Sequence, residues 1–65
     1  MSWIQTSILQ MKENNQDLFQ GEIYRGTGTS PNEKYQLLRI SPKYATFTEA
    51  LNWCEIEELN LEGRN

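Results

Sequence analysis

The sequence predicts an α+β fold in which a three-stranded antiparallel β-meander is followed by one C-terminal helix on one face of the sheet (β-β-β-α). Two observations carry this prediction. Turn-forming clusters divide the first two thirds of the chain into three short segments with β-type side chains. The last third begins with a capping motif and continues with apolar residues at helical spacing. With 65 residues, the chain corresponds to a single small domain, 1–65.

The second and third strands are expected at residues 18–26 and 34–40. The second strand contains Gly21, which disfavours a helix. Its residues alternate between two faces, one with Phe19, Gly21, Ile23 and Arg25 and the other with Leu18, Gln20, Glu22 and Tyr24. Residues 26–33 hold two glycines and a proline and predict a long hairpin loop. The dipeptide Ser41-Pro42 is expected to end the third strand, because proline restricts the preceding residue and lacks an N–H donor.

The segment expected to form the first strand, residues 4–12, fits two structures. Ile4, Ile8 and Met11 have helical spacing, whereas Ile4, Thr6 and Ile8 also alternate as in a strand. We favour a strand, because Thr, Ser and Ile are indifferent helix formers and the Asn-rich turn at 13–17 would pair the segment with the next one. A helix remains the alternative.

The helix is expected at about residues 47–58. Thr46 and Glu49 have the spacing of a capping box. Glu57 and Glu58 oppose the negative end of the helix dipole, so residues 59–65 are expected to be a frayed tail. The stripe predicted to close the sheet consists of Phe47, Ala50, Leu51 and Cys54.

Some apolar residues have no place in this arrangement. Trp53 and Ile56 lie outside the predicted stripe, and tryptophan is enriched at interface hot spots. Both faces of the sheet carry apolar or aromatic groups, including Tyr24 and Tyr35, although one helix covers one face only. In the third strand, Tyr35 and Leu37 are expected on one face, with Leu38 and Ile40 on the other. We predict Trp53, Ile56, Tyr24 and Tyr35 as partner-binding residues.

These surfaces predict a small non-enzymatic protein-interaction module. It would be an adaptor or inhibitor of a larger protein, and it would self-associate into a homo-oligomer. A core of this size contributes only about 3–5 kcal/mol, and a single cysteine excludes an intrachain disulfide as a staple. Association with a protein partner, or with a second copy, is the remaining way to stabilise such a chain.

Several classes of function are disfavoured. The chain has no histidine, and Cys54 falls on the predicted buried stripe, so we predict no catalytic residue, metal site or cofactor. The net charge of −3 argues against nucleic-acid binding. No apolar run is long enough to span a bilayer, and with a single free cysteine we expect a cytoplasmic protein.

The glycine-rich loop supports an alternative function. Glycines let backbone N–H groups approach an anion, hydroxyl groups donate hydrogen bonds, and a neighbouring cation adds charge. An oligomer could therefore bind or sequester a small anionic ligand, a phosphate-containing metabolite or nucleotide. The residues predicted to bind it are Arg25, Thr27, Thr29 and Lys34.

Overall fold

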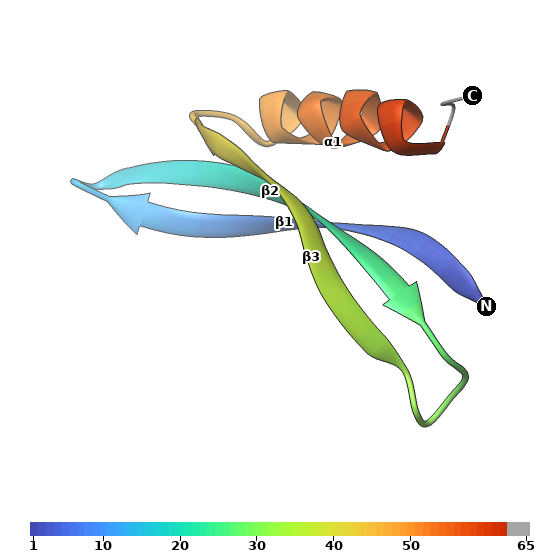
Figure 1. Cartoon of the computed structure of the whole chain (residues 1–65). Coiled ribbons are helices and arrows are strands. Elements are labelled where there is room, and N and C mark those ends of the chain that lie inside the picture. The colour runs from blue at the N-terminus through green and yellow to red at the C-terminus, as the bar shows by residue number, and fades with distance from the viewer. Residues whose placement is uncertain (63–65) are drawn as a thin grey trace.

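The computed structural model describes residues 1–62 and shows three antiparallel strands followed by one helix (Figure 1). The strands are β1 (Ser2–Glu13), β2 (Gln16–Thr27) and β3 (Lys34–Tyr44), and the helix is α1 (Phe47–Glu62). The strand order β1-β2-β3 is that of a meander. The predicted β-β-β-α fold is confirmed, and the ambiguous first segment is a strand. Residues 63–65 of the predicted tail lie outside the described residues.

β1 and β2 form a regular hairpin through a two-residue turn. Asn14 and Asn15 both have positive φ, 51° and 63°, as a type I′ turn requires. This turn matches the right-handed twist of the strands, and the pairing continues without interruption from Glu13↔Gln16 to Ser2↔Thr27. The turn therefore fixes the register of the whole hairpin.

β3 contains two irregularities opposite β2, one between Gln20 and Glu22 and one between Ile23 and Tyr24. At the first, the Ser41 hydroxyl accepts a hydrogen bond of 2.7 Å from the Gly21 N–H. The side chain thus replaces a backbone acceptor, and Pro42 lies at a bulge, where its missing donor is tolerated. This is why β3 continues to Tyr44, and the predicted end of the strand at residue 40 was wrong.

The helix begins at the predicted cap. The Glu49 N–H donates to Thr46 Oγ1 at 3.2 Å, and the Thr46 hydroxyl donates to Glu49 Oε1 at 3.0 Å. The far end extends to Glu62, beyond the predicted residue 58. Near this end Glu57 pairs with Arg39 of β3 at 3.7 Å, and Leu61 in the added turn is half-buried.

The core lies where α1 approaches β2 most closely. Its fully buried apolar side chains are Ile23, Ala50 and Cys54. A Cβ atom on Gly21 would lie 2.6 Å from Cys54 Sγ and 3.0 Å from Trp53 Cε3, so only glycine allows this approach. At the start of the helix, the Phe19 and Phe47 rings meet edge to face with centroids 6.1 Å apart.

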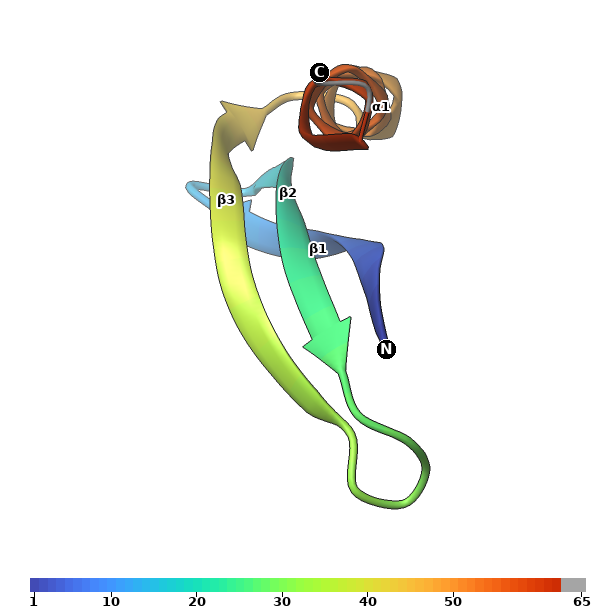
Figure 2. The same ribbon diagram turned by 45° about the vertical axis from the view of Figure 1, so that its right-hand side comes forward.

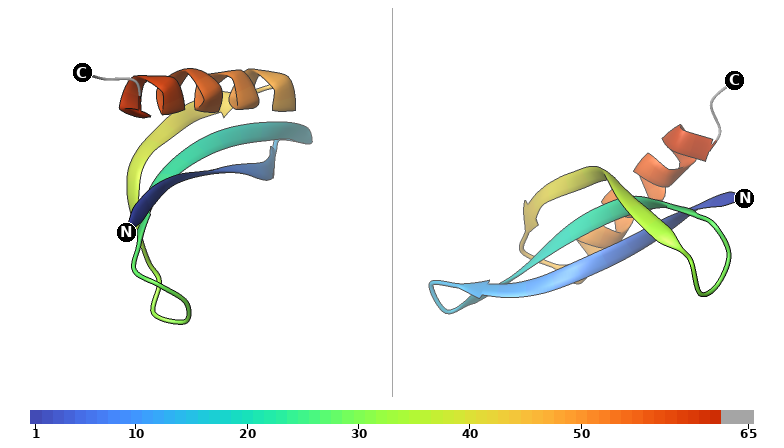
Figure 3. Two further views of the ribbon diagram at one scale, coloured as in Figure 1. Left: turned by 90° about the vertical axis from the view of Figure 1, so that its right-hand side faces the viewer. Right: turned by 60° about the horizontal axis from the view of Figure 1, so that its bottom comes forward.

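The molecule is thin and elongated. Its dimensions are 41 × 30 × 14 Å, and its radius of gyration is 13.4 Å, against about 11 Å expected for a compact chain of this length. The helix covers one part of the sheet, while the β2–β3 loop projects from the opposite end (Figure 2). In the two further views the helix lies on one face of the curved sheet (Figure 3). Much of the sheet is therefore left uncovered.

Prediction one concerns Gly21. Replacement Gly21→Ala places a methyl group against Cys54 and Trp53, so we expect the free energy of unfolding to fall by about 1–3 kcal/mol through overpacking. Urea denaturation followed by circular dichroism measures this change. In a Cys54→Ala background the sulfur atom that the added methyl would clash with is absent, so the decrease in the free energy of unfolding should be smaller. Equal losses in both backgrounds would contradict the proposed contact.

Candidate protein-binding face of the sheet

The face of the sheet opposite α1 carries a set of side chains that we call the open face. Phe19, Gly21 and Ile23 of β2 face the helix, so the alternating residues of β2 and the residues paired with them belong to the opposite face. The open face comprises Trp3, Gln5, Ser7, Leu9 and Met11 of β1, Leu18, Gln20, Glu22, Tyr24 and Gly26 of β2, and Tyr35, Leu37, Ile40 and Lys43 of β3.

Apolar side chains are exposed on the open face. Leu9 of β1 is 43% exposed, and on β3 the exposed fractions are 49% for Tyr35, 48% for Leu37 and 51% for Ile40. Tyr35, Leu37 and Ile40 are successive side chains on this face of β3, which is an outer strand of the sheet. A row of half-exposed large side chains is more than the single scattered apolar residues that a monomer surface normally shows.

The bulges of β3 create this row. We predicted Ile40 on the face opposite to Tyr35 and Leu37, from strict alternation. The pairing shows Leu37 opposite Tyr24 and Ile40 opposite Glu22, with one extra residue of β3 between these pairs. The extra residue reverses the alternation, so Ile40 shares the face of Leu37 and the earlier assignment was wrong. The alternation of residues 35–40 in the sequence predicts a regular strand, and no residue there signals the bulge.

An aromatic pair lies at one end of the open face. The Trp3 and Tyr35 rings meet edge to face, with centroids 6.0 Å apart and an interplanar angle of 83°. Gly26 pairs with both residues, and the Trp3 indole lies directly over it, in space that any Cβ atom would occupy. Glycine in this strand thus lets two aromatic side chains from different strands meet across it.

Beside this pair is a shallow hollow of about 310 Å³, lined by Gln5, Ser7, Tyr24 and Tyr35. The two predicted tyrosines therefore come together on the open face. The Tyr24 hydroxyl donates to Glu22 Oε1 at 2.7 Å, and this bond raises the pKa of Tyr24. Burial, followed by the charge of Glu33, raises the pKa of Tyr35. Both phenols therefore remain protonated at neutral pH and can accept hydrogen bonds from a partner.

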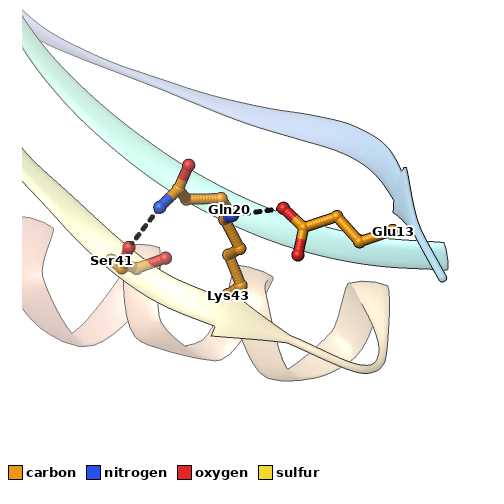
Figure 4. A network of polar contacts seen from close by, with 4 residues as sticks. All are labelled: Glu13, Gln20, Ser41 and Lys43. Atoms are coloured by element: carbon orange, nitrogen blue, oxygen red, sulfur yellow. Dashed lines mark hydrogen bonds and ion pairs between the residues drawn. The ribbon is translucent and has the colours of Figure 1, made fainter. Parts of the chain in front are cut away.

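A polar network closes the other end of the open face (Figure 4). Lys43 of β3 reaches across β2 to form an ion pair with Glu13 of β1, and Gln20 donates from its amide to the Ser41 carbonyl at 2.8 Å. These contacts tie all three strands together where the first hairpin turns. The exposed apolar groups are thus bounded by polar groups on one side.

The helix presents a different face to the sheet from the one predicted. Phe47 and Leu51, expected to be covered, are 51% and 37% exposed, while Ala50 and Cys54 are buried as expected. Trp53, expected to face a partner, is half-buried and lies beside Gly21. The reason is the flat surface that glycine offers to the indole, which turns the helix toward Trp53. The expectation that Trp53 lies outside the sheet-facing stripe was therefore wrong.

Besides Phe47 and Leu51, the helix carries two more exposed apolar residues, nearer its C-terminal end. Ile56 is 59% exposed, in agreement with its predicted position outside the stripe, and Leu59 is 68% exposed. Leu59 was not predicted, because it was assigned to the frayed tail. It lies in a shallow groove of about 320 Å³ with Glu55, Glu58 and Glu62. Three carboxylates therefore line the groove around Leu59, whereas the hollow of the open face is lined by Gln5, Ser7, Tyr24 and Tyr35 and by no charged side chain.

The structure places the anion-binding candidates around the β2–β3 loop, far from the helix. Arg25, Thr27 and Lys34 share one face of the hairpin, and Thr29 lies in the loop. Two backbone donors of the loop are already used: Gly28 N–H donates to the Met1 carbonyl at 3.2 Å, and Asn32 N–H donates to the Thr29 carbonyl at 2.6 Å. These two groups are therefore not free to bind a phosphate.

Cys54 is 1% exposed, and burial raises the pKa of its thiol. It fills the space between α1 and β2 in the way expected of a small apolar side chain. Within residues 1–62, no group of three His, Cys, Asp or Glu side chains is placed to hold a metal ion. The same residues contain no helix of the length and apolarity that crossing a membrane requires.

Comparison of the chain with protein-family models, curated proteins and solved structures finds no match.

Prediction two concerns the thiol of Cys54. Because the side chain is buried and its pKa is raised, little thiolate is accessible at pH 8, and we expect it to react with Ellman's reagent about 100-fold or more slower than in unfolded protein. Absorbance at constant pH follows the reaction, and the urea-unfolded chain provides the reference rate. A native rate near that reference would contradict the buried position.

Proposed function

We propose that the chain is a small non-enzymatic protein-interaction module, an adaptor or an inhibitor, that binds a larger protein through the open face. The single observation that carries the proposal is the row of Tyr35, Leu37 and Ile40, each about half exposed on a face opposite the helix. Leu9 on β1 extends the apolar area across the sheet. A protein surface of matching shape would remove these side chains from water.

Completing the burial of one half-exposed aliphatic side chain contributes roughly 1 kcal/mol, so several such residues acting together supply a useful part of a binding free energy. The Trp3–Tyr35 pair adds rigid aromatic groups, which are frequent anchors at interfaces. The hollow beside it offers the amide of Gln5 and the hydroxyl of Ser7 for hydrogen bonds.

The open face is preferred over the outer side of the helix, the other surface predicted to bind a partner. Trp53, which was the main reason for choosing the helix, contacts Gly21 of the sheet. On the outer side of the helix, Ile56 and Leu59 lie near Glu55, Glu58 and Glu62, whose desolvation would oppose burial. A helix-based interface thus has the higher electrostatic cost.

Prediction three compares the two surfaces directly. A photo-reactive benzoylphenylalanine in place of Leu37 should cross-link a protein in the cells from which the chain comes, whereas the same group at the exposed Asn52 of α1 should not. With that protein purified, Leu37→Ser should weaken binding by roughly 5- to 10-fold in calorimetry, because it removes one apolar anchor.

The matched control is Ile56→Ser, which removes a side chain of similar size and exposure from the helix and should leave the affinity unchanged. Loss of binding by Ile56→Ser but not by Leu37→Ser would assign the interface to the helix and contradict the proposal. Absence of any cross-link at Leu37 would also count against it.

A further inference from the structure

The two outer strands of the sheet differ in how they are protected from pairing with another strand. β3 carries Lys34, Arg39 and Lys43, contains Pro42 and is interrupted by bulges. All of these features discourage strand addition at an edge. β1 is regular over its whole length, and its residues 2–11 include no charged side chain and no proline. The edge of β1 is therefore the one suited to pairing.

The backbone groups available at this edge follow from the hairpin. In an antiparallel pair, residues alternate between those bonded to the neighbouring strand and those directed away from it. Glu13 and Gln16 flank the two-residue turn, and Gly28 N–H donates to the Met1 carbonyl at the other end of the pairing. Both ends show that odd-numbered residues of β1 bond to β2. Within the uncharged residues 2–11, those directed outward are Ser2, Ile4, Thr6, Ile8 and Gln10, and Lys12 is directed outward beyond this stretch.

The polarity of β1 is symmetric about Thr6. Reading outward from Thr6, both directions meet a polar residue, two apolar residues and a polar residue. Two such strands, paired antiparallel with Thr6 opposite Thr6, place Ile4 against Ile8 and Trp3 against Leu9. Gln5 then meets Ser7, and Ser2 meets Gln10. Every apolar side chain faces an apolar one and every polar side chain a polar one, as stable cross-strand pairs require.

We propose that β1 pairs with β1 of a second copy of this chain, antiparallel and centred on Thr6, so that two three-stranded sheets become one continuous sheet. The outward-directed residues would form about ten backbone hydrogen bonds. The contact is isologous, since the same strand serves both subunits. Its two-fold axis is perpendicular to the sheet, so both helices lie on one side and the two open faces are continuous on the other.

A second copy fits this edge better than an unrelated strand. The symmetric polarity of residues 2–10 matches itself in one register, and shifting the centre to Ser7 would put Leu9 against Gln5 and Ile4 against Gln10. The absence of charge over the same residues removes repulsion between two identical strands. Leu9, 43% exposed in one copy, would pack beside Trp3 of the other along the continuous open face.

Prediction four uses the backbone of Thr6. Its N–H is directed away from β2, so Thr6→Pro removes donors from the proposed interface without removing a bond of the β1–β2 hairpin. Sedimentation over a concentration series should show a dimer for the natural chain, and Thr6→Pro should weaken dimerisation by about 100-fold or more. Thr6→Val is the matched control; it keeps the N–H and the branched shape and should remain a dimer.

A second measurement tests the register and does not depend on the folding of the proline variant. Gln5 and Ser7 would form a non-hydrogen-bonded pair with Cα atoms about 4.5 Å apart, close enough for a disulfide. Mixing a Gln5→Cys chain with a Ser7→Cys chain under mild oxidation should give the mixed disulfide. Mixing Gln5→Cys with Leu9→Cys should not, because that pair belongs to the register centred on Ser7.

A natural chain that stays monomeric over the whole concentration series overturns the proposal, as does a dimer that Thr6→Pro leaves intact. Preferential cross-linking of Gln5→Cys with Leu9→Cys overturns the register centred on Thr6. These results are independent of the open-face proposal, because Leu37→Ser should leave the sedimentation of the dimer unchanged while it weakens partner binding. The two proposals can thus fail separately.

Discussion

The close approach of α1 to β2 at Gly21 determines most of the arrangement. Gly21 removes the side chain that would keep the helix away, and Ala50 and Cys54 are small enough to enter the space. Ile23 is then fully enclosed beside them. The same glycine gives the Trp53 indole a flat surface, which sets the rotation of the helix about its axis. A larger residue at position 21 would alter the depth and the rotation of the helix together.

This packing leaves the two faces of the sheet unequal. One helix of 16 residues lies on strands of 11 and 12 residues, and it covers part of one face. The enclosed apolar core is correspondingly small, and large apolar side chains remain on the opposite face. Because burying apolar surface is the main source of folding free energy, so small a core contributes only modest stability. The small core and the exposed apolar surfaces thus both result from a single helix covering only part of one face of the sheet.

Local sequence signals predicted the elements well. Asn14 and Asn15 specify the first turn through their tolerance of positive φ, and Thr46 with Glu49 specifies the start of the helix. The burial of Cys54 was also predicted correctly. These features depend on residues close together in the chain, so their physical cause is visible in the sequence.

Features that depend on distant residues were not predicted. The rotation of the helix depends on Gly21, more than 30 positions before Trp53, and the continuation of β3 depends on a Ser41 hydroxyl bonding to the Gly21 amide. The bulge that places Ile40 beside Leu37 likewise exists only when β2 and β3 are paired. Of the residues predicted to bind a partner, Tyr24 and Tyr35 share the hollow, whereas Trp53 is half-buried beside Gly21.

The irregular course of β3 has one more consequence. A sheet with two regular edges is a template that can lengthen without limit, as fibrils do. Here Pro42 and the bulges interrupt the hydrogen-bonding row along one border, so strands can be added on the β1 side only. If β1 pairs with β1 of a second copy as proposed, that side is occupied and the sheet ends with two copies. The serine–proline step would then limit assembly to a dimer, although the central part of the β1 border carries no charge.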